Sequence, residues 1–535
     1  MSAFMNDNKT HHHTDSSKKN SGGQPFIRRR EVTMSCPNGW GGYWEREVSP
    51  RIKERICYEL WSPEALSRYL DMLKAFGFNS IQTMETTQAY ANTGVTREAL
   101  RPKILHLLKA ARERGMTASH IIASNVCYDP EARDPRFPVT RFDLCWHDPV
   151  ERRILEEHYR YQSEYAPYVD HLVTHWADPG GGKEGCERCN YRGALELHNT
   201  ILTIFRARNS KIRSTFNTWM LQSSGWNRWP GLNLDSILHS GILAPDAGVA
   251  IGLMNCGADG RRLDWAGQLK SEDVAAIRET GRTAGIWGWY TTDMEILPSL
   301  HIHTDILQNY FCSLVEPSGG WIDWHTVDDT CHGFNMPNLY VAGRLMQNPG
   351  ENARELIDEF LHLYFGNEIA PLMAEALRVI EKTRGQSLRY AAQVGDPSEE
   401  LHNADMRATR ELTGKSSWRK DILALAEEAG KRLEHVGIRA DHVPPFPTPM
   451  PPADYLEEVK AHLRAIAQFM RFLIEADQVW QLLHQKAAPE IVQAAIARLP
   501  EVENSSEHLV HLERSMAQRT KNELCKKAQV HAAGV

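Results

Sequence analysis

Three acidic residues have the placement that acid–base chemistry requires. Asp178 ends an apolar run, and a Pro-Gly-Gly turn follows it directly. Asp293 and Glu295 are two residues apart, so an extended backbone would point both carboxyl groups to one side. Two neighbouring carboxylates repel each other, which raises one pKa and leaves a proton donor beside an ionised partner. We predict that all three are catalytic; the alternatives are a turn-capping aspartate and a solvated pair at a helix start.

Aromatic residues precede the acidic pair. Trp287 and Trp289 share a face if the backbone is extended, and Tyr290 follows them. Such an aromatic wall would desolvate Glu295 and raise its pKa, so we expect Glu295 to be the general acid and one of the two aspartates to be the base or nucleophile. The chain contains 15 Trp, 16 Tyr and 15 Phe. Residues of this kind stack on sugar rings, although they also fill large cores.

The segment 317–338 has the densest mixture of polar and aromatic residues in the chain. A long loop of this kind after the last strand of a sheet is typical of a functional segment. We predict that it binds substrate hydroxyl groups through His325, Asp328, Asp329 and Asn335. The further predicted substrate contacts are Glu85, His120, Asn217, Trp219, Trp287, Trp289 and Tyr290.

Two patterns raise the question of a metal. Cys186-x-x-Cys189 has half the spacing of a zinc site, but a full site needs two more ligands and no second such pair exists. Structural zinc with distant partners and plain packing of two thiols are the two interpretations. His301, His303 and Asp305 would form a ligand set only on an extended backbone. The prediction therefore includes no metal and no cofactor, and the state of the cysteine pair stays open.

Short apolar runs alternate with amphipathic segments from about residue 55, as in βα units. Ser62 and Pro63 are typical of a helix start, and Gly77 of a helix end. The predicted strands are residues 55–61, 79–84, 116–124, 171–177, 211–219, 248–254, 283–290 and 311–315. Eight strands with intervening helices predict an α/β fold, a (β/α)8 TIM barrel, rather than an open doubly wound sheet. In such a barrel the catalytic residues lie at the carboxyl ends of the strands.

The chain divides into three predicted parts: a disordered tail over 1–32, a catalytic barrel over 33–350 and an α-helical domain over 351–535. The helical part rests on Ala/Leu/Glu/Arg-rich segments with helical spacing. These segments are 352–366, 368–394, 404–437, 453–486 and 488–524. The proline-rich segment 443–452 interrupts them and is predicted to be a loop.

Composition limits the function classes. The 535 residues are 42% hydrophobic and 24% charged, which is typical of globular proteins. With 61 basic and 68 acidic residues the formal net charge is −7, which argues against a nucleic-acid partner. No apolar run is long enough to cross a membrane, and residues 1–32 contain no export signal. We expect a cytoplasmic protein with a carbohydrate substrate and no nucleic-acid or membrane partner, and leave homo-oligomerisation open.

The loop beginning Asp178-Pro-Gly-Gly, with its Cys-x-x-Cys, resembles the strand-four loop of barrel glycoside hydrolases of the β-hexosaminidase and α-glucuronidase-like groups. The segment 348–366 is similar to the helix that follows the barrel in those groups, and the resemblance covers about 50–370. The hexosaminidase group has an adjacent Asp-Glu pair after strand four, whereas Pro179 follows here, and Gly182 replaces the first cysteine of the loop. The resemblance implies a barrel glycosidase without implying an N-acetyl sugar.

The predicted function is an exo-acting glycoside hydrolase that cleaves a glycosidic bond of an oligosaccharide with a pair of carboxylates. One alternative is a metal-dependent sugar isomerase, epimerase or lyase on the same barrel. It requires at least two histidines to converge, from the set His120, His175, His301, His303, His325 and His332. The other alternative is a sugar-binding barrel without catalysis.

Overall fold

The computed structural model describes residues 24–34, 54, 57–85, 95–128, 131, 140–141, 144–175, 186, 189, 191–218, 233–253, 269–288, 300, 302–329, 334–394, 416–439, 442–503 and 512–533. Eight parallel strands form a closed barrel in the order β1-β10-β9-β8-β7-β6-β3-β2. The strands are β1 (Ile27–Met34), β2 (Ser80–Met84), β3 (Thr117–Ala123), β6 (His171–His175), β7 (Arg213–Asn217), β8 (Gly248–Leu253), β9 (Ala284–Gly288) and β10 (Ile322–Asp329). A short antiparallel pair, β4 (Cys127–Tyr128) and β5 (Thr140–Arg141), follows β3.

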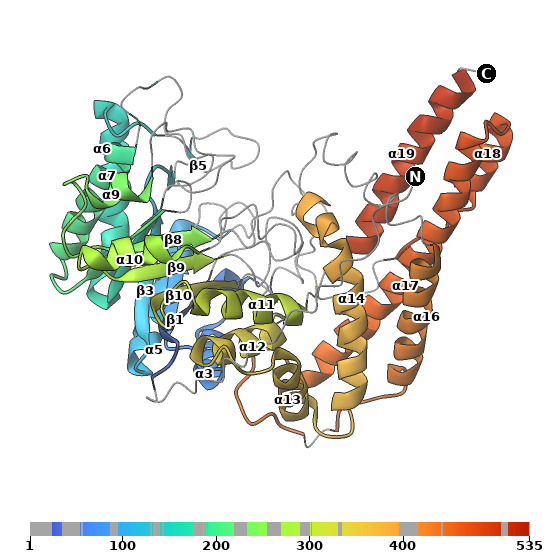
Figure 1. The fold of residues 1–535 in the computed structure, drawn as a ribbon, viewed down its shortest axis with the longest axis horizontal. Helices are drawn as coiled ribbons and strands as arrows, with labels where there is room; N and C mark the ends of the chain where they lie inside the picture. Colours follow the sequence, from blue (N-terminus) through green and yellow to red (C-terminus); the bar gives the residue numbers. More distant parts are fainter. Residues whose placement is uncertain are drawn as a thin grey trace.

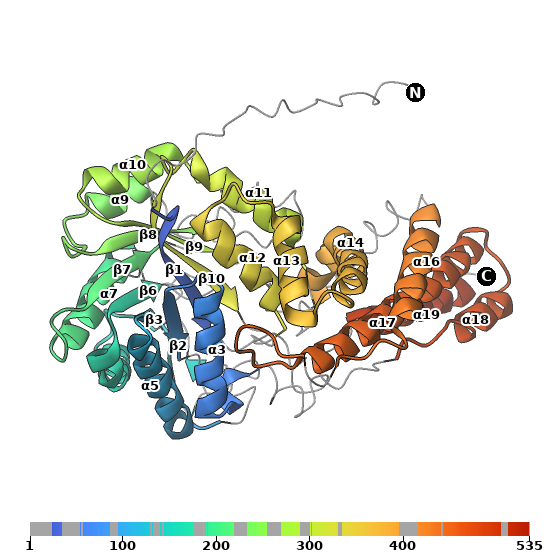
Figure 2. The ribbon, with the colours of Figure 1, turned by 90° about the horizontal axis from the view of Figure 1, so that it is seen from below.

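Helices surround the barrel, as Figure 2 shows. They are α3 (Pro63–Ala75), α5 (Arg97–Glu113), α6 (Pro149–Gln162), α7 (Tyr191–Arg206), α9 (Leu234–Leu238), α10 (Ser271–Glu279), α11 (Thr304–Val315) and α12 (Met336–Gln347), with 3-10 turns η2 (Tyr58–Leu60) and η3 (Ser163–Tyr168). Local chemistry explains the first of them. The Ser62 hydroxyl accepts a hydrogen bond from the Ala65 amide, Pro63 opens α3, and Gly77 has a φ of +97°, as the sequence predicts.

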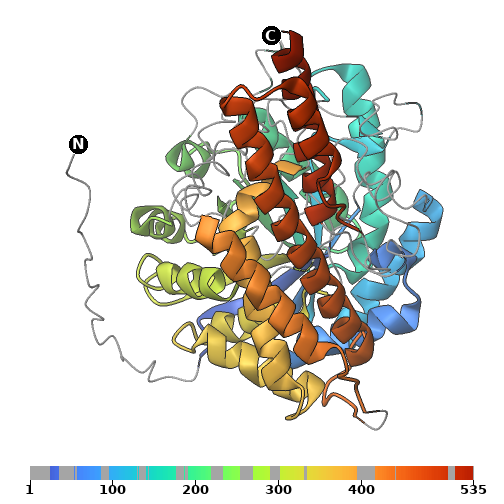
Figure 3. The same ribbon diagram turned by 90° about the vertical axis from the view of Figure 1, so that its right-hand side faces the viewer.

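The chain continues into a helical extension beside the barrel (Figure 1). It contains α13 (Ala353–Phe365), α14 (Ala370–Val394), α16 (Ser416–Leu433), α17 (Pro452–His484), α18 (Pro489–Ala497) and α19 (Leu512–Ala533). Helix α13 packs on α11 and α12 and also on α14, and α17 contacts α14, α16, α18 and α19. Figure 3 shows these long helices side by side. The predicted barrel followed by a helical region is therefore confirmed. No helix in the described ranges has the length and apolar character to span a membrane.

Two of the predicted strands are wrong. The first strand is Ile27–Met34 rather than 55–61, so the tail predicted over 1–32 contributes to the barrel from residue 27 onward. The predicted eighth strand, 311–315, lies within helix α11, and the eighth strand is Ile322–Asp329. The segment 317–338 is consequently not one long loop. It holds β10, in which Ile322 and Trp324 alternate with polar residues, and it ends in the first turn of α12.

Charged residues of β1 are accommodated inside the barrel. The carboxylate of Glu31 is fully buried. It accepts hydrogen bonds from Ser80 and Ser119 (2.5 Å each), Gln82 Nε2 (2.7 Å) and Trp324 Nε1 (2.9 Å). The Nε of Arg29 lies 3.9 Å from Glu31 Oε2, and its guanidinium lies 4.9 Å above the Trp324 ring. A buried charge is tolerated when it is paired and hydrogen-bonded, so a strand with four consecutive charged residues can line a barrel.

Candidate active site at the carboxyl ends of the strands

Two aromatic side chains meet across the lumen at the carboxyl ends of β6 and β9. On β6, the ring of His171 lies 5.8 Å from that of Trp324, inside the lumen. Side chains alternate along a strand, so His175 faces the lumen as well. Its ring lies 5.9 Å from the ring of Trp287 on β9, with an interplanar angle of 61°. Both rings are buried.

Asn217, the last residue of β7, faces the same space. Thr215 Oγ1 lies 2.8 Å from His171 Nε2, so Thr215 faces the lumen and Asn217, two residues later, does too. We call His175, Asn217 and Trp287 the mouth group. Two of its members, Asn217 and Trp287, are predicted substrate contacts, and they lie at the end of the barrel that holds active sites in this fold. Their contact with substrate stays a prediction. The sequence singled out His175 only as a candidate metal ligand.

The His175 imidazole is poised for hydrogen bonding. His175 is 7% exposed, and burial lowers the pKa of its ring to about 4. Neither ring nitrogen has a hydrogen-bond partner within the described part of the chain. At neutral pH the ring is therefore uncharged and offers one donor and one acceptor. Asn217 and Trp287 are 1% and 2% exposed, so the mouth group forms the floor of this end of the lumen. Imidazole, amide and indole groups are side-chain types that bind sugars.

A polar layer lies between the mouth group and the hydrogen bonds around Glu31. Thr33 donates a hydrogen bond to Gln82 Oε1 at 2.9 Å, and its oxygen lies 2.6 Å from Thr326 Oγ1. Gln82 in turn donates to Glu31 at 2.7 Å. The strand register places Thr326 beside Trp287. The lumen beneath the mouth is thus filled by a hydrogen-bonded side-chain network, which leaves the carboxyl-end side for a ligand.

Two histidines predicted to bind substrate face the helices instead of the lumen. His120 is fully buried, with Nδ1 2.9 Å from Thr83 Oγ1 and Nε2 3.0 Å from Gln162 Oε1. His325 is also fully buried, and its Nε2 lies 2.7 Å from the hydroxyl of Tyr310 on α11. Both residues occupy outward positions of their strands, so the prediction that they contact substrate is corrected: they stabilise the contact between strands and helices.

Two further predicted contacts are occupied by structural interactions. Glu85 accepts hydrogen bonds from Arg97 Nε and the Tyr165 hydroxyl, both at 2.8 Å. Asn335 precedes α12 and accepts a hydrogen bond from Asn338 Nδ2 at 2.7 Å. Glu85 links β2 to the helix layer, and Asn335 orders the start of α12. We therefore assign neither of them to the site.

The remaining predicted site residues are not placed by the structure. Asp178, Trp219, Trp289, Tyr290, Asp293 and Glu295 lie outside the described residues. Asp328 and Asp329 are described only as the backbone of the last two positions of β10, where they pair with Thr33 and Met34 of β1. These eight assignments stay predictions from the sequence.

The histidines required by a metal-dependent sugar enzyme do not converge where they are described. His120 and His325 pack on different helices, and His303 lies at the start of α11 with its ring buried, which lowers its pKa to about 4. Asp305, the acidic member of the predicted ligand set, accepts a hydrogen bond from Arg354 at 2.5 Å. His301 and His332 lie outside the described residues.

A group of thiols does converge. Within the described ranges, the one group of three or more potential metal ligands with adjacent ligand atoms is Cys145, Cys186 and Cys189. Cys145 was not singled out from the sequence, because it belongs to a different loop from the Cys-x-x-Cys pair. Only its residue type could have drawn attention to it.

Comparison with known proteins identifies the fold. The structure of a GH138 enzyme targeting pectin rhamnogalacturonan II matches with a TM-score of 0.53 and 12% sequence identity, over 95% of this chain and 63% of that chain. CpGH84B matches with a TM-score of 0.49 and 11% identity over 94% of this chain and 77% of that chain. The exo-beta-1,4-mannosidase Op5Man5 from Opitutaceae bacterium strain TAV5 matches with a TM-score of 0.38 and 11% identity, over 64% and 68% of the two chains.

These similarities concern the fold. At 12% identity and a TM-score of 0.53, the match to the GH138 enzyme shows a shared barrel fold, and this chain spans less than two thirds of the length of that enzyme. No model of a protein family matches the chain, and no curated protein matches it. The expected resemblance to barrel glycoside hydrolases is thus confirmed at the level of fold, and a fold does not by itself determine an activity.

Proposed function

We propose that this barrel is a glycoside hydrolase that acts from the free end of an oligosaccharide. The observation that carries the proposal is the mouth group: His175, Asn217 and Trp287 bring a neutral imidazole, an amide and an indole together at the carboxyl ends of three strands. Hydroxyl partners beside an aromatic face are what a sugar ring requires. The packed lumen beneath them closes the site from below, as in other barrels of this fold. The action at a chain end is carried over from the sequence prediction.

The predicted carboxylates follow the strands that carry the mouth group. Asp178 comes three residues after His175, and Glu295 comes seven residues after Gly288, the last residue of β9. The His175–Trp287 contact brings the origins of the two loops together across the lumen. This supports Glu295 as general acid and Asp178 or Asp293 as base or nucleophile.

A cytoplasmic location is part of the proposal. The sulfur atoms of three described cysteines, Cys145, Cys186 and Cys189, lie within 4.8 Å of one another. Thiols at such close range persist in a reducing compartment. An enzyme in this location would act on oligosaccharide fragments that enter the cell.

The test is turnover of a panel of aryl glycosides that includes glucuronides and N-acetylhexosaminides. The variants are Asp178→Asn and Glu295→Gln, and the matched controls are Asp358→Asn on α13 and Glu375→Gln on α14. Two-carboxylate hydrolysis predicts losses of about 10³-fold or more in both site variants, because general acid–base groups contribute ~10²–10⁴-fold each. The controls should retain full activity.

The same panel separates the alternatives. Cleavage by the wild type that survives a chelator supports hydrolysis by carboxylates. Activity that a chelator abolishes and a divalent ion restores contradicts the proposal and favours a metal-dependent reaction. Sugar binding by calorimetry without turnover of any bound sugar favours the non-catalytic alternative.

A further inference from the structure

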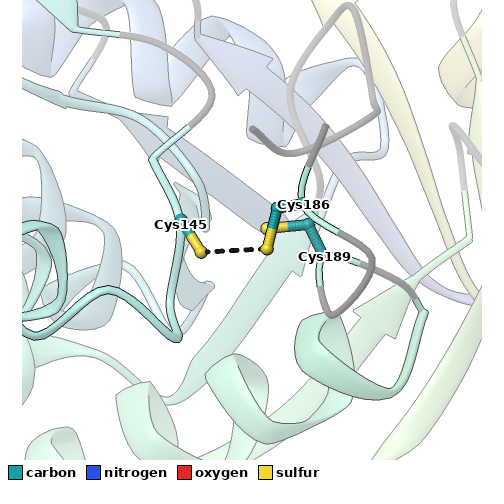
Figure 4. Close-up of side chains that lie close together, drawn as sticks. All are labelled: Cys145, Cys186 and Cys189. Atoms are coloured by element: carbon teal, nitrogen blue, oxygen red, sulfur yellow. Dashed lines mark hydrogen bonds between the residues drawn. The ribbon is translucent and has the colours of Figure 1, made fainter. Parts of the chain in front are cut away.

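Three cysteine thiols from two loops meet at the carboxyl-end side of the barrel. Cys145 precedes α6, and Cys186 and Cys189 precede α7. The three sulfur atoms lie within 4.8 Å of one another, and the Sγ atoms of Cys145 and Cys186 are 3.5 Å apart. Figure 4 shows the side chains pointing toward one another from opposite sides of the gap between the two loops.

The spacing of the sulfur atoms suits a tetrahedral metal ion. Zinc binds thiolates at about 2.3 Å, and a tetrahedral arrangement then places sulfur atoms about 3.8 Å apart. The observed separations, 3.5 Å for one pair and at most 4.8 Å for the others, bracket that value. Zinc also takes soft thiolate ligands readily, and sites built from cysteine sulfur are typical of it.

The backbone around the thiols is ordered by hydrogen bonds before any metal binds. The Cys189 amide donates to the Cys186 carbonyl at 3.1 Å, which closes a turn and brings both side chains to one side. The Cys145 amide donates to the Glu151 carboxylate at 2.7 Å, and the Asp148 amide donates to the Cys145 carbonyl at 3.1 Å. Such supporting contacts hold ligands in place and strengthen metal binding.

The burial of the three cysteines and their access to solvent also suit a metal site. Cys145 and Cys189 are buried, whereas Cys186 is partly exposed and gives a path by which an ion can enter. Three adjacent thiolates would repel one another strongly in the absence of a cation. A divalent ion compensates that charge, and binding releases the thiol protons.

We infer that Cys145, Cys186 and Cys189 form a structural zinc site that ties the loop before α6 to the loop before α7. The thiolates occupy three of the four positions of the ion, and the fourth is left to water or to a residue outside the described ranges. The site fixes Cys186, which follows His175 by eleven residues, and so fixes the far end of the loop after β6. The same loop carries Asp178 in the sequence. This last consequence rests on the proposed function, whereas the metal site itself does not.

The first test measures metal in the full-length protein purified without chelator and under reducing conditions. We expect about one zinc per chain by mass spectrometry, because a structural zinc site binds one ion. Cys145→Ser and Cys189→Ser should each raise the zinc dissociation constant at least ~10-fold, as loss of a ligand or its support does. Cys312→Ser, an exposed cysteine on α11, is the matched control and should keep its zinc.

A second test needs no variant and so does not depend on mutant folding. In wild-type protein, bound zinc should protect Cys145, Cys186 and Cys189 from alkylation, as peptide mapping measures, and chelation should expose all three. The inference is overturned if zinc added to the reduced protein is not bound, if the serine variants keep zinc with unchanged affinity, if the bound metal is iron, or if the purified protein contains a Cys145–Cys186 disulfide. None of these readouts uses turnover, so failure here is distinguishable from failure of the glycosidase proposal.

Discussion

The imidazole of His175 packs against the indole of Trp287 with ring centroids 5.9 Å apart. The two residues lie at the carboxyl ends of β6 and β9, which are not adjacent in the barrel, so the contact crosses the lumen. It forms the upper boundary of the packed barrel interior. A substrate of the proposed glycosidase would therefore bind on the carboxyl-end side of this pair.

Replacement of Trp287 by phenylalanine should weaken substrate recognition. The smaller ring keeps an aromatic face but gives up roughly 1–1.5 kcal/mol of contact, which corresponds to about a tenfold loss of kcat/KM. Steady-state kinetics with the aryl glycoside that the wild type cleaves fastest measures this loss of kcat/KM. The matched control is Trp321→Phe, because Trp321 precedes β10 at the amino end and stacks with Arg28 and Arg278. Equal losses in both variants would contradict a role for Trp287 at the mouth.

The free energy of unfolding should decrease as the pH falls, and His175 should account for part of this decrease. Burial lowers its pKa from 6.5 to about 4. The unfolded chain therefore binds a proton that the folded chain does not, so the contribution is complete above pH 6.5 and is lost as the pH falls toward 4. Between the two pKa values this group adds a slope of up to about 1.4 kcal/mol per pH unit.

Urea unfolding at a series of pH values tests this. His175→Phe should show a shallower dependence of unfolding free energy on pH than the wild type. His239→Phe, which changes an exposed histidine, is the control and should keep the wild-type slope. An unchanged slope in His175→Phe would show that the ring titrates normally in the folded protein.

Glu31→Gln should destabilise the barrel strongly. The change removes the negative partner of Arg29, whose pKa burial lowers to about 10 while Glu31 raises it. Breaking a buried ion pair at one end costs about 3–5 kcal/mol. Glu359→Gln removes a carboxylate that pairs with Arg344 at the surface, and should cost no more than about 1 kcal/mol.

The stabilities of Glu31→Gln and Glu359→Gln are compared by urea unfolding, with tryptophan fluorescence as the signal. A combined Arg29→Met and Glu31→Leu variant should recover part of the stability lost in Glu31→Gln, since it leaves no buried charge unpaired. If the combined variant is less stable than Glu31→Gln, the hydrogen bonds to Glu31 contribute more than the charge pairing.

Two glycine substitutions should change the free energy of unfolding in opposite directions. A Cβ at Gly285 would lie 2.3 Å from the Trp324 ring, which the lumen holds in place, so Gly285→Ala should cost ~1–3 kcal/mol by overpacking. At Gly430 in α16 no atom lies within 4 Å of a Cβ, so Gly430→Ala should stabilise the chain by ~0.5–1 kcal/mol. Thermal unfolding midpoints measure both, and equal effects would contradict the close approach at Gly285.

The sequence by itself determined the succession of helices and most strands. The Ser62 cap, the proline after it and the glycine at the end of α3 act locally, so their effect is visible in the residues. The strand Ile27–Met34 was not predicted, because its charged residues, Arg28, Arg29, Arg30 and Glu31, are typical of a solvated tail. The burial of Glu31 depends on partners from β2, β3 and β10, which no local pattern contains.

Only the tertiary structure decided which side chains face the lumen. Barrel strands are buried on both faces, so apolar periodicity does not distinguish the lumen side from the helix side. His120 and His325 therefore looked equivalent to Asn217 in the sequence, although they face helices. The same holds for Cys145, which is 41 residues from Cys186 along the chain and 3.5 Å from it in space. Contacts across the lumen and between loops arise when the barrel closes, and residue spacing along one segment carries no information about them.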